Sequence, residues 1–144
     1  MPLTLFQNKK DKQTRASIKQ LIGFKPKNLK LYKKAFRHLS ASENIQFTSQ
    51  KNSNERLEYL GDAVLDMVIA EIIFKKFPFK GEGFLTEVRS KIVSRKQLSF
   101  MAIKIGIPSF IEVEDVLHKN RHVMGSLAGN ALEALVGAIY LDRG

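Results

Sequence analysis

The sequence predicts an all-α fold, and three observations support this prediction. Apolar residues recur at helical spacing through nearly the whole chain. Asparagine, glycine and proline residues stand where such helices would begin or end. The 144 residues are 44% apolar and 26% charged, a globular composition of a length that suits one domain with its own core. No internal repeat or low-complexity tract interrupts the pattern.

The N-terminal quarter is expected to hold two helices. An apolar stripe that includes Ile18 predicts the first helix over residues 11–22, closed by Gly23. After a proline break, Asn28 is positioned to cap the second helix, whose apolar residues continue at helical spacing to Leu39.

A long helix is expected in the middle of the chain. Residues 40–53 are polar and turn-like, which indicates a loop. Asn54 then caps a helix that runs to about Phe77 and is ended by Pro78. Because this helix is apolar on most sides, we expect it to be the central helix of the domain.

Three further helices are predicted in the C-terminal half. Two short ones are expected at about residues 84–93 and 95–105. Residues 107–125 are too broken in pattern for an assignment. Ser126 is expected to open a last apolar helix that continues to near Gly144.

The excess positive charge lies entirely in the N-terminal quarter. Residues 1–39 hold eleven basic residues and one acidic residue, whereas residues 40–144 hold thirteen of each sign, so the whole net charge of +10 belongs to residues 1–39. This asymmetry indicates either a polyanionic partner, with phosphates foremost, or a solubilising surface. An acidic membrane surface is a weaker alternative, because no strongly apolar face accompanies the lysines.

Several classes of protein are excluded by composition. No cysteine occurs, which excludes a disulfide framework, thiolate zinc sites and a cysteine nucleophile. The longest apolar stretches, residues 63–74 and 131–141, are too short to span a membrane and carry acidic residues. The N-terminus lacks the pattern of a signal peptide. We therefore expect a soluble cytoplasmic protein with no membrane partner.

Carboxylates recur on one face of the predicted central helix. Glu55, Glu58 and Asp62 are spaced i, i+3 and i+7, and Asp66 continues the same face one turn later. Like charges at this spacing repel each other unless a cation or a basic group neutralises them. A solvated acidic face that pairs with lysine and arginine is the alternative interpretation.

The last predicted helix carries a second unusual polar pair. Asn130 and Glu133 are the only strongly polar side chains between residues 127 and 141. A carboxylate on so apolar a helix is not expected to be buried without a partner. If the two helices pack together, Glu58 and Asp62 could meet this pair, and four oxygen donors suit Mg²⁺ or Mn²⁺.

At these same residues the sequence resembles a ribonuclease III domain. The segment 54–65, NERLEYLGDAVL, matches the signature stretch of that family nearly residue for residue. Three further segments follow the order of the family's motifs, namely 36–42, 77–89 and 127–142. Together the four segments span about residues 28–144, which makes the resemblance far more specific than a lone short motif.

The resemblance implies an all-helical endonuclease that cuts double-stranded RNA with Mg²⁺, for which Mn²⁺ can substitute. The family's metal ligands correspond to Glu58, Asp62, Asn130 and Glu133, of which Asp62 and Glu133 are expected to be the most essential for catalysis. Metal-activated water would leave 5′-phosphate and 3′-hydroxyl ends with a two-nucleotide 3′ overhang. Processing of ribosomal RNA precursors and of messenger RNA is the implied role.

The resemblance also implies a homodimer. Glu55 and Glu82 match acidic positions that line the family's catalytic valley, and we expect supporting roles for them. Tyr59 occupies a signature position whose aromatic ring packs into the partner subunit in family members. Ordinary core packing of Tyr59 is the alternative.

Two residues depart from the family's pattern. Leu39 stands where an arginine is usual, and Asn130 stands where the family has an aspartate. Asparagine keeps one carbonyl oxygen as a ligand but removes a negative charge, so metal affinity should fall. A variant that still cleaves, a degenerate scaffold and a laboratory change are the possible explanations. A non-catalytic RNA-binding dimer is therefore the alternative function, although the retained acidic residues favour an active site.

Compared with bacterial ribonuclease III proteins, the chain is expected to be a fragment, with its last helix truncated and a double-stranded-RNA-binding domain absent.

The histidines are weaker candidates for a metal site. His118 and His122 are spaced i, i+4 but lie in a polar stretch without a third ligand, and His38 is expected to have a structural role. An unrelated helical di-metal protein would need histidines beside the acids.

Overall fold

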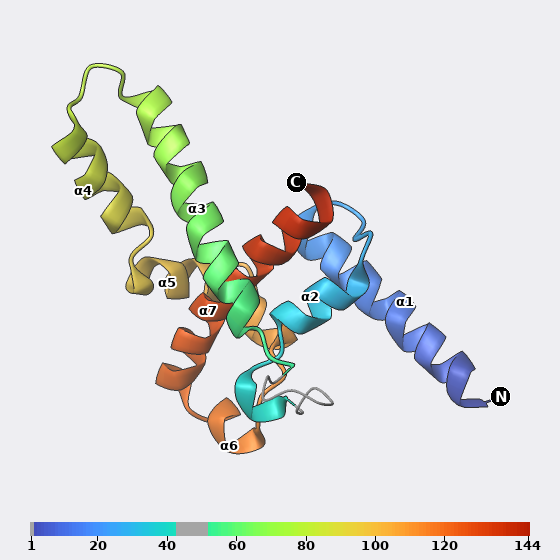
Figure 1. The fold of residues 1–144 in the computed structure, drawn as a ribbon. Helices are drawn as coiled ribbons and strands as arrows, with labels where there is room; N and C mark the ends of the chain where they lie inside the picture. Colours follow the sequence, from blue (N-terminus) through green and yellow to red (C-terminus); the bar gives the residue numbers. More distant parts are fainter. Residues whose placement is uncertain (1, 43–51) are drawn as a thin grey trace.

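The computed structural model describes residues 2–42 and 52–144, so most of the predicted loop at residues 40–53 lies outside the described residues. The described residues form helices with no strand among them, and the prediction of an all-α fold is confirmed (Figure 1). The helices are α1 (Pro2–Ile22), α2 (Leu29–Ala35), the 3₁₀ helix η1 (Leu39–Ala41), α3 (Glu55–Lys76), α4 (Glu82–Ile92), α5 (Arg95–Lys104), the 3₁₀ helix η2 (Ile107–Phe110), α6 (Asp115–His118) and α7 (Arg121–Arg143).

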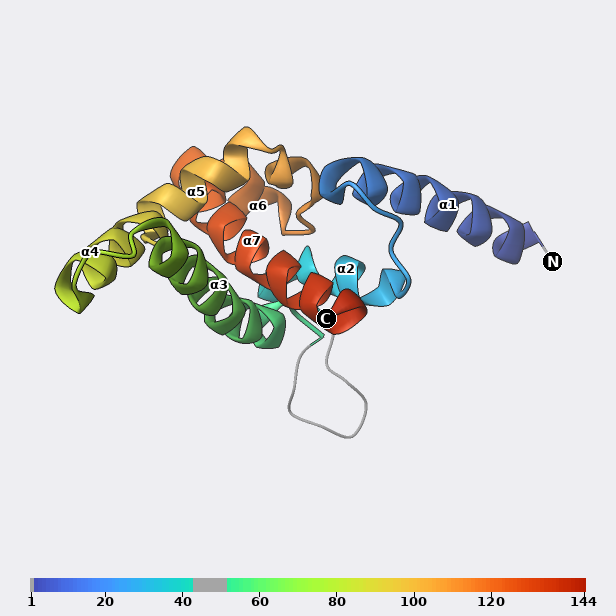
Figure 2. The same cartoon turned by 90° about the horizontal axis from the view of Figure 1, so that it is seen from above.

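Helix α7 is the central helix, and the expectation that residues 54–77 hold this place is wrong. α7 packs against α2, α3 and α5, and it lies between them in both views (Figures 1 and 2). Most of the residues that it buries are alanine or glycine, whereas α3 buries only Leu57, Gly61 and Ile73. Small side chains let neighbouring helices approach α7 from several sides, while bulky apolar side chains of α3 such as Met67 remain exposed.

By length and composition alone, α7 is apolar enough to cross a membrane. In this fold, half of its apolar window is buried inside the protein. A helix that is apolar nearly all round is also what the core of a folded domain requires.

Two glycines determine how closely α3 and α7 approach each other. A Cβ atom built on Gly61 would lie 1.6 Å from the carbonyl oxygen of Glu133, and one built on Gly137 would lie 2.4 Å from the carbonyl oxygen of Leu57. The two helices therefore touch backbone to backbone at this crossing. The contact fixes the N-terminal half of α3, which carries Glu58, against the middle of α7.

The N-terminal helices are confirmed in number but differ in length from the prediction. α1 begins at Pro2 rather than at residue 11. Asn28 is confirmed as the N-cap of α2, because its side chain accepts a hydrogen bond from the backbone N–H of Lys30.

Helix α2 ends at Ala35 and does not continue to Leu39 as expected. Beyond it, the Nδ1 atom of His38 accepts a hydrogen bond from the backbone N–H of Ser40 and so caps η1. This bond gives His38 a local structural role, as expected.

Asn54 precedes α3 as predicted, but its side chain does not cap that helix. Its Nδ2 atom instead donates a hydrogen bond to the carbonyl oxygen of Ala35 at 3.1 Å, and its backbone N–H donates to Arg37 at 2.9 Å. These bonds tie the first turn of α3, which carries Glu55 and Glu58, to the end of α2.

The two short helices are confirmed as α4 and α5, and the unassigned segment at residues 107–125 contains η2, α6 and the first turn of α7. α7 begins at Arg121 rather than at the predicted Ser126. The side chain of Asn120 caps it by accepting hydrogen bonds from the N–H groups of His122 and Val123. An asparagine cap five residues earlier thus overrides the apolar pattern used for the prediction.

The other end of α7 is anchored through Asp142, whose side chain is only 1% exposed. Its carboxylate accepts hydrogen bonds from the backbone N–H groups of Lys27 and Asn28 and from the hydroxyl of Tyr32. Burial alone would raise the pKa of Asp142, but these hydrogen bonds outweigh it and hold that pKa below its ordinary value. The segment between α1 and α2 is thereby fastened to the central helix.

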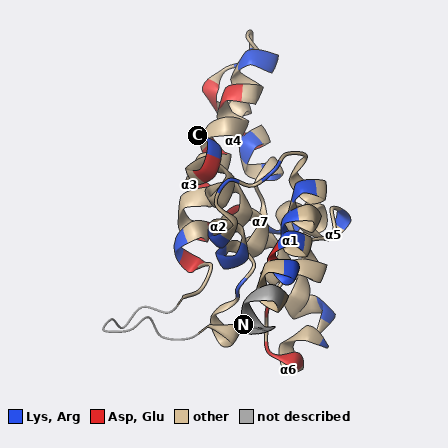
Figure 3. Cartoon of the chain, turned by 90° about the vertical axis from the view of Figure 1, so that its right-hand side faces the viewer, with Lys and Arg blue, Asp and Glu red and all other residues tan. Residues whose placement is uncertain are grey.

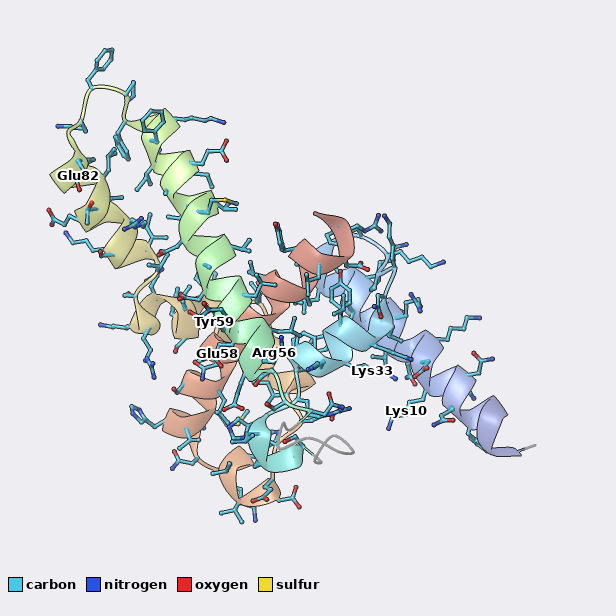
Figure 4. All side chains as sticks on the ribbon, viewed as in Figure 1. Lys10, Lys33, Arg56, Glu58, Tyr59 and Glu82 are labelled. Atoms are coloured by element: carbon cyan, nitrogen blue, oxygen red, sulfur yellow. The ribbon has the colours of Figure 1, made fainter. Side chains whose placement is uncertain are left out.

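Eight of the eleven basic residues of the N-terminal quarter lie on α1 and α2 (Figure 3). Figure 4 shows Lys10 and Lys33 on this side of the molecule, away from Glu58. Two of the basic side chains form ion pairs, Lys33 with Asp11 and Arg37 with Glu112. The excess positive charge is therefore separate from the acidic face of α3.

Candidate active site

Five of the residues singled out in the sequence meet in one cavity between α3 and α7. Glu55, Glu58 and Asp62 of α3 and Asn130 and Glu133 of α7 line a cavity of about 540 Å³. A neighbouring cavity of about 240 Å³ shares Glu58, Asn130 and Glu133 with it. Figure 4 shows Glu58 and Tyr59 on the N-terminal half of α3, beside α7. The predicted convergence of the two polar groups is therefore present in the fold.

The geometry follows from helical spacing and from the glycine crossing. Glu58 and Asp62 are four residues apart and so share one face of α3, as Asn130 and Glu133 share one face of α7 by their i, i+3 spacing. Because Gly61 brings α3 onto the backbone of Glu133, both faces open onto the same cavity.

The acidic side chains of this cavity are not fully neutralised by nearby basic groups. Burial, followed by the charges of Asp62 and Glu58, raises the pKa of Glu133 to about 7, although Arg95 partly opposes these effects. Burial also raises the pKa of Glu58, with Glu55 as the next cause. Raised carboxyl pKa values in a cleft are typical of functional sites. Such a cluster favours a bound cation.

The alternative of an acidic face neutralised by basic side chains holds only for the far part of the helix. Asp66 lies 4.0 Å from Arg89, and Lys75 pairs with Glu71. In the described parts of the chain, none of the four acids of the cavity lies within 4.0 Å of a lysine or arginine nitrogen.

The residues of the cavity fit a hard divalent cation by their chemistry. Three carboxylates, of Glu58, Asp62 and Glu133, and the amide of Asn130 are oxygen ligands of the kind that Mg²⁺ and Mn²⁺ prefer. Within residues 2–42 and 52–144, no three carboxylate, histidine or cysteine side chains stand close enough together to hold an ion as they are placed. Binding would therefore draw the carboxylates inward and relieve their mutual repulsion.

Glu82 is not brought to this cavity within one chain. It lies at the start of α4, which together with the C-terminal half of α3 forms an arm that projects from the domain (Figures 1 and 4). The supporting role of Glu82 stays a prediction.

Tyr59 lines the rim of the cavity and is 83% exposed, so the alternative of core packing is wrong for the single chain. Its role as a dimer contact also stays a prediction.

Sequence reasoning missed Arg95, which lines both cavities from the first turn of α5. Arg95 belongs to α5, a different helix from those that carry the acidic residues. No periodic signal in the sequence could have placed Arg95 at the cavity.

The paired histidines fail as a metal site, because His118 ends α6 and His122 belongs to α7.

We expect the stability of the metal-free domain to fall as the pH rises from about 4.5 to above 7. Folding raises the pKa of Glu133 from 4.5 to about 7, so its stabilising contribution is complete below the unfolded value and is lost as the pH rises through about 7. Mg²⁺ should therefore raise Tm more at about pH 8 than at about pH 6. Thermal melts in EDTA and in Mg²⁺ test this, with Glu133→Gln as the control. Equal Mg²⁺ effects at the two pH values would contradict it.

The chain has clear relatives. The family model described as ribonuclease-III-like matches residues 28–144. Over 135 residues the chain is 44% identical to a protein named Ribonuclease 3 from Azobacteroides pseudotrichonymphae, which covers 94% of this chain and 50% of the relative. It is 46% identical over 136 residues to Ribonuclease 3 of Phocaeicola vulgatus, covering 94% of this chain and 43% of that protein. The chain thus spans about half the length of the curated relatives it matches.

Solved structures agree in fold. The nuclease domain of ribonuclease III from Campylobacter jejuni is similar with a TM-score of 0.76 and 35% sequence identity, over 88% of this chain and 84% of that one. Dicer from Pichia stipitis is similar with a TM-score of 0.60 and 28% identity, over 82% of this chain and 48% of that one. The resemblance noted in the sequence is confirmed, and the chain belongs to the ribonuclease-III-like family.

Proposed function

We propose that this domain is a divalent-metal-dependent endoribonuclease that cuts double-stranded RNA in the cytoplasm, in ribosomal RNA precursors and structured messenger RNAs. The observation that supports the proposal is the single cavity lined by Glu58, Asp62, Asn130 and Glu133, in a chain of this family. Its relatives carry the name Ribonuclease 3. An acidic cavity whose negative charge is not neutralised by basic groups is the kind of site that a metal-dependent nuclease requires.

In this mechanism Glu58, Asp62, Asn130 and Glu133 would hold Mg²⁺, or Mn²⁺ as a substitute. When bound, the ion lowers the pKa of water and neutralises charge on the phosphate. Glu58 and Glu133 are half-buried and would hold the ion from two helices, whereas Asp62 is exposed. Hydrolysis breaks the bond between phosphorus and the 3′ oxygen, which gives 5′-phosphate and 3′-hydroxyl ends. Helical RNA is recognised by shape, through phosphates and 2′-hydroxyls.

The test is cleavage of an end-labelled RNA duplex in EDTA, Mg²⁺ and Mn²⁺, with the product ends sequenced. The proposal predicts metal-dependent products with two-nucleotide 3′ overhangs. Absence of cleavage in both metals would contradict it.

A homodimer is the second part of the proposal. The projecting arm exposes large apolar side chains, which on a soluble domain mark an interaction surface. The solved nuclease domain from C. jejuni has a region involved in dimer formation. The exposed apolar residues of the arm are Met67, Val68, Ile72, Phe74, Phe79, Phe84 and Ile92.

Charging this surface should separate the subunits. The double variant Val68→Asp/Ile72→Asp places two carboxylates in an apolar contact, and we expect the dimer to weaken by about 100-fold or more. Val116→Asp is the control, because Val116 is 79% exposed on α6, outside the arm. Sedimentation velocity at micromolar concentration measures both. A double variant that sediments like the unmodified chain would show that the arm is not the interface.

The alternative function, a non-catalytic RNA-binding dimer, is favoured by one observation. Asn130 contributes a neutral amide where a fourth carboxylate would complete the site. RNA binding without cleavage in Mg²⁺ or Mn²⁺ would support this alternative.

Asn130→Asp should strengthen metal binding about tenfold or more, because it adds a negative charge beside Glu133 and Glu58. Cleavage at limiting Mg²⁺ should rise in parallel. Calorimetric titration with Mn²⁺ measures the affinity, and Asn120→Asp, at the N-cap of α7 and outside both cavities, is the matched control. Unchanged Mn²⁺ affinity in the Asn130→Asp protein would exclude this residue as a ligand.

A further inference from the structure

A second pocket, of about 520 Å³, lies beside the acidic cavity and has the opposite charge. It is formed by the N-terminal ends of α5 and α7. Arg95 and Lys96 line it from α5, and Arg121 and His122 line it from α7, with Ser99 and Ser126 between them. We call this the basic pocket.

No acidic side chain lines the basic pocket. In the part of the chain that the structure describes, none of its lysine and arginine side chains lies within 4.0 Å of a carboxylate oxygen. The first turns of α5 and α7 also contain no acidic residue, so the positive ends of both helices remain without a compensating charge. Cations that converge from two helices repel one another unless an anion lies between them.

The basic pocket is continuous with the candidate active site through one residue. Arg95 lines the basic pocket and both parts of the acidic cavity. Its place is fixed by close packing of α5 on α7, because a Cβ atom on Gly129 would lie 3.1 Å from the Oγ atom of Ser99. Gly129 immediately precedes Asn130, so the crossing that positions Arg95 also positions a candidate metal ligand.

Arg95 weakens the metal binding that the acidic residues alone would provide. A guanidinium beside Glu58 and Glu133 repels a divalent cation and so lowers metal affinity. A group that makes the metal site weaker needs another ligand to explain its place, and a phosphate is the anion that suits a guanidinium best.

We propose that the basic pocket is a phosphate subsite for the RNA strand that is cut, with Arg95 contacting a phosphate next to the scissile one. This inference rests on the proposed function, because it takes RNA as the substrate of the acidic cavity. The subsite fixes the strand relative to the acids through phosphate contacts, which carry no base specificity. Arg121 and Lys96 bind the phosphates that follow along the same strand.

Duplex binding without cleavage tests the subsite. The full chain and its variants Arg95→Ala and Arg121→Ala are titrated against a fluorescein-labelled RNA duplex in EDTA, and anisotropy is measured at several salt concentrations. Each variant should weaken binding roughly three- to tenfold and reduce the slope of log K against log salt by about one. Lys104→Ala removes the same charge from the other end of α5, outside both pockets, and should change binding less than about twofold.

A second readout separates phosphate binding from a structural role. Arg95→Ala should bind Mn²⁺ more tightly than the unmodified chain while it binds the duplex more weakly, because the same charge repels the metal and attracts the phosphate. If both variants keep the affinity and salt slope of the unmodified chain, or if that chain binds no duplex, the subsite is wrong. If they lose affinity but the unmodified chain cleaves nothing in metal, the subsite stands and the proposed catalysis fails.

Discussion

Gly61→Ala should destabilise the domain strongly. The added Cβ atom would lie 1.6 Å from the carbonyl oxygen of Glu133, and the obstacle is backbone that cannot rotate away. α3 and α7 would have to separate along their whole contact, which is the largest helix pairing in the described structure. Overpacking of this kind costs about 3 kcal/mol or more, a large part of the 5–15 kcal/mol by which a domain is stable.

The matched control changes the same residue type with the opposite expected sign. Gly83 lies in the first turn of α4, and a Cβ atom there meets nothing within 4 Å. Gly83→Ala should therefore stabilise the domain by up to about 1 kcal/mol through helix propensity. Urea unfolding followed by circular dichroism measures both variants. If Gly61→Ala unfolds at the urea concentration of the unmodified chain, the two helices do not cross at these glycines.

Part of the site could be predicted because it is encoded locally. The spacing of Glu58 and Asp62 places them on one face of any helix, whatever that helix packs against. Glu133 was identified because a lone carboxylate on an apolar helix needs a partner. The sequence resemblance then supplied the pairing of the two helices.

The rest depends on contacts between distant segments. Arg95 reaches the cavity only because α5 packs on α7 through Gly129, which no periodicity reveals. α7 could not be recognised as the central helix, because α3 and α7 are both long and apolar, and α3 carries bulky apolar residues such as Met67 that a core would also use. Those bulky residues are exposed on the arm, and hydrophobicity alone does not distinguish a core helix from a helix whose apolar face lies on the surface.

Glu133→Gln should reduce the rate of cleavage by roughly 10³-fold or more, while making the metal-free domain more stable at neutral pH. The amide has nearly the same shape but removes the charge that would hold the cation, and a neutral oxygen cannot replace a carboxylate at this position. It also removes a group that is repelled by Asp62 and Glu58 and whose pKa is raised to about 7, so Tm should rise at pH values above that.

The two effects of Glu133→Gln have opposite signs, and together they distinguish a functional carboxylate from a structural one. Replacing a carboxylate that stabilises the fold would lower both Tm and activity. Replacing a metal ligand that is kept at the expense of stability raises Tm while activity is lost. Glu71→Gln removes one charge from an exposed ion pair on α3 and should leave cleavage unchanged. Single-turnover cleavage in Mg²⁺ and melting in EDTA give the two values. Turnover within tenfold of the unmodified chain would exclude Glu133 from the catalytic site, because an essential metal ligand cannot be replaced at so small a cost.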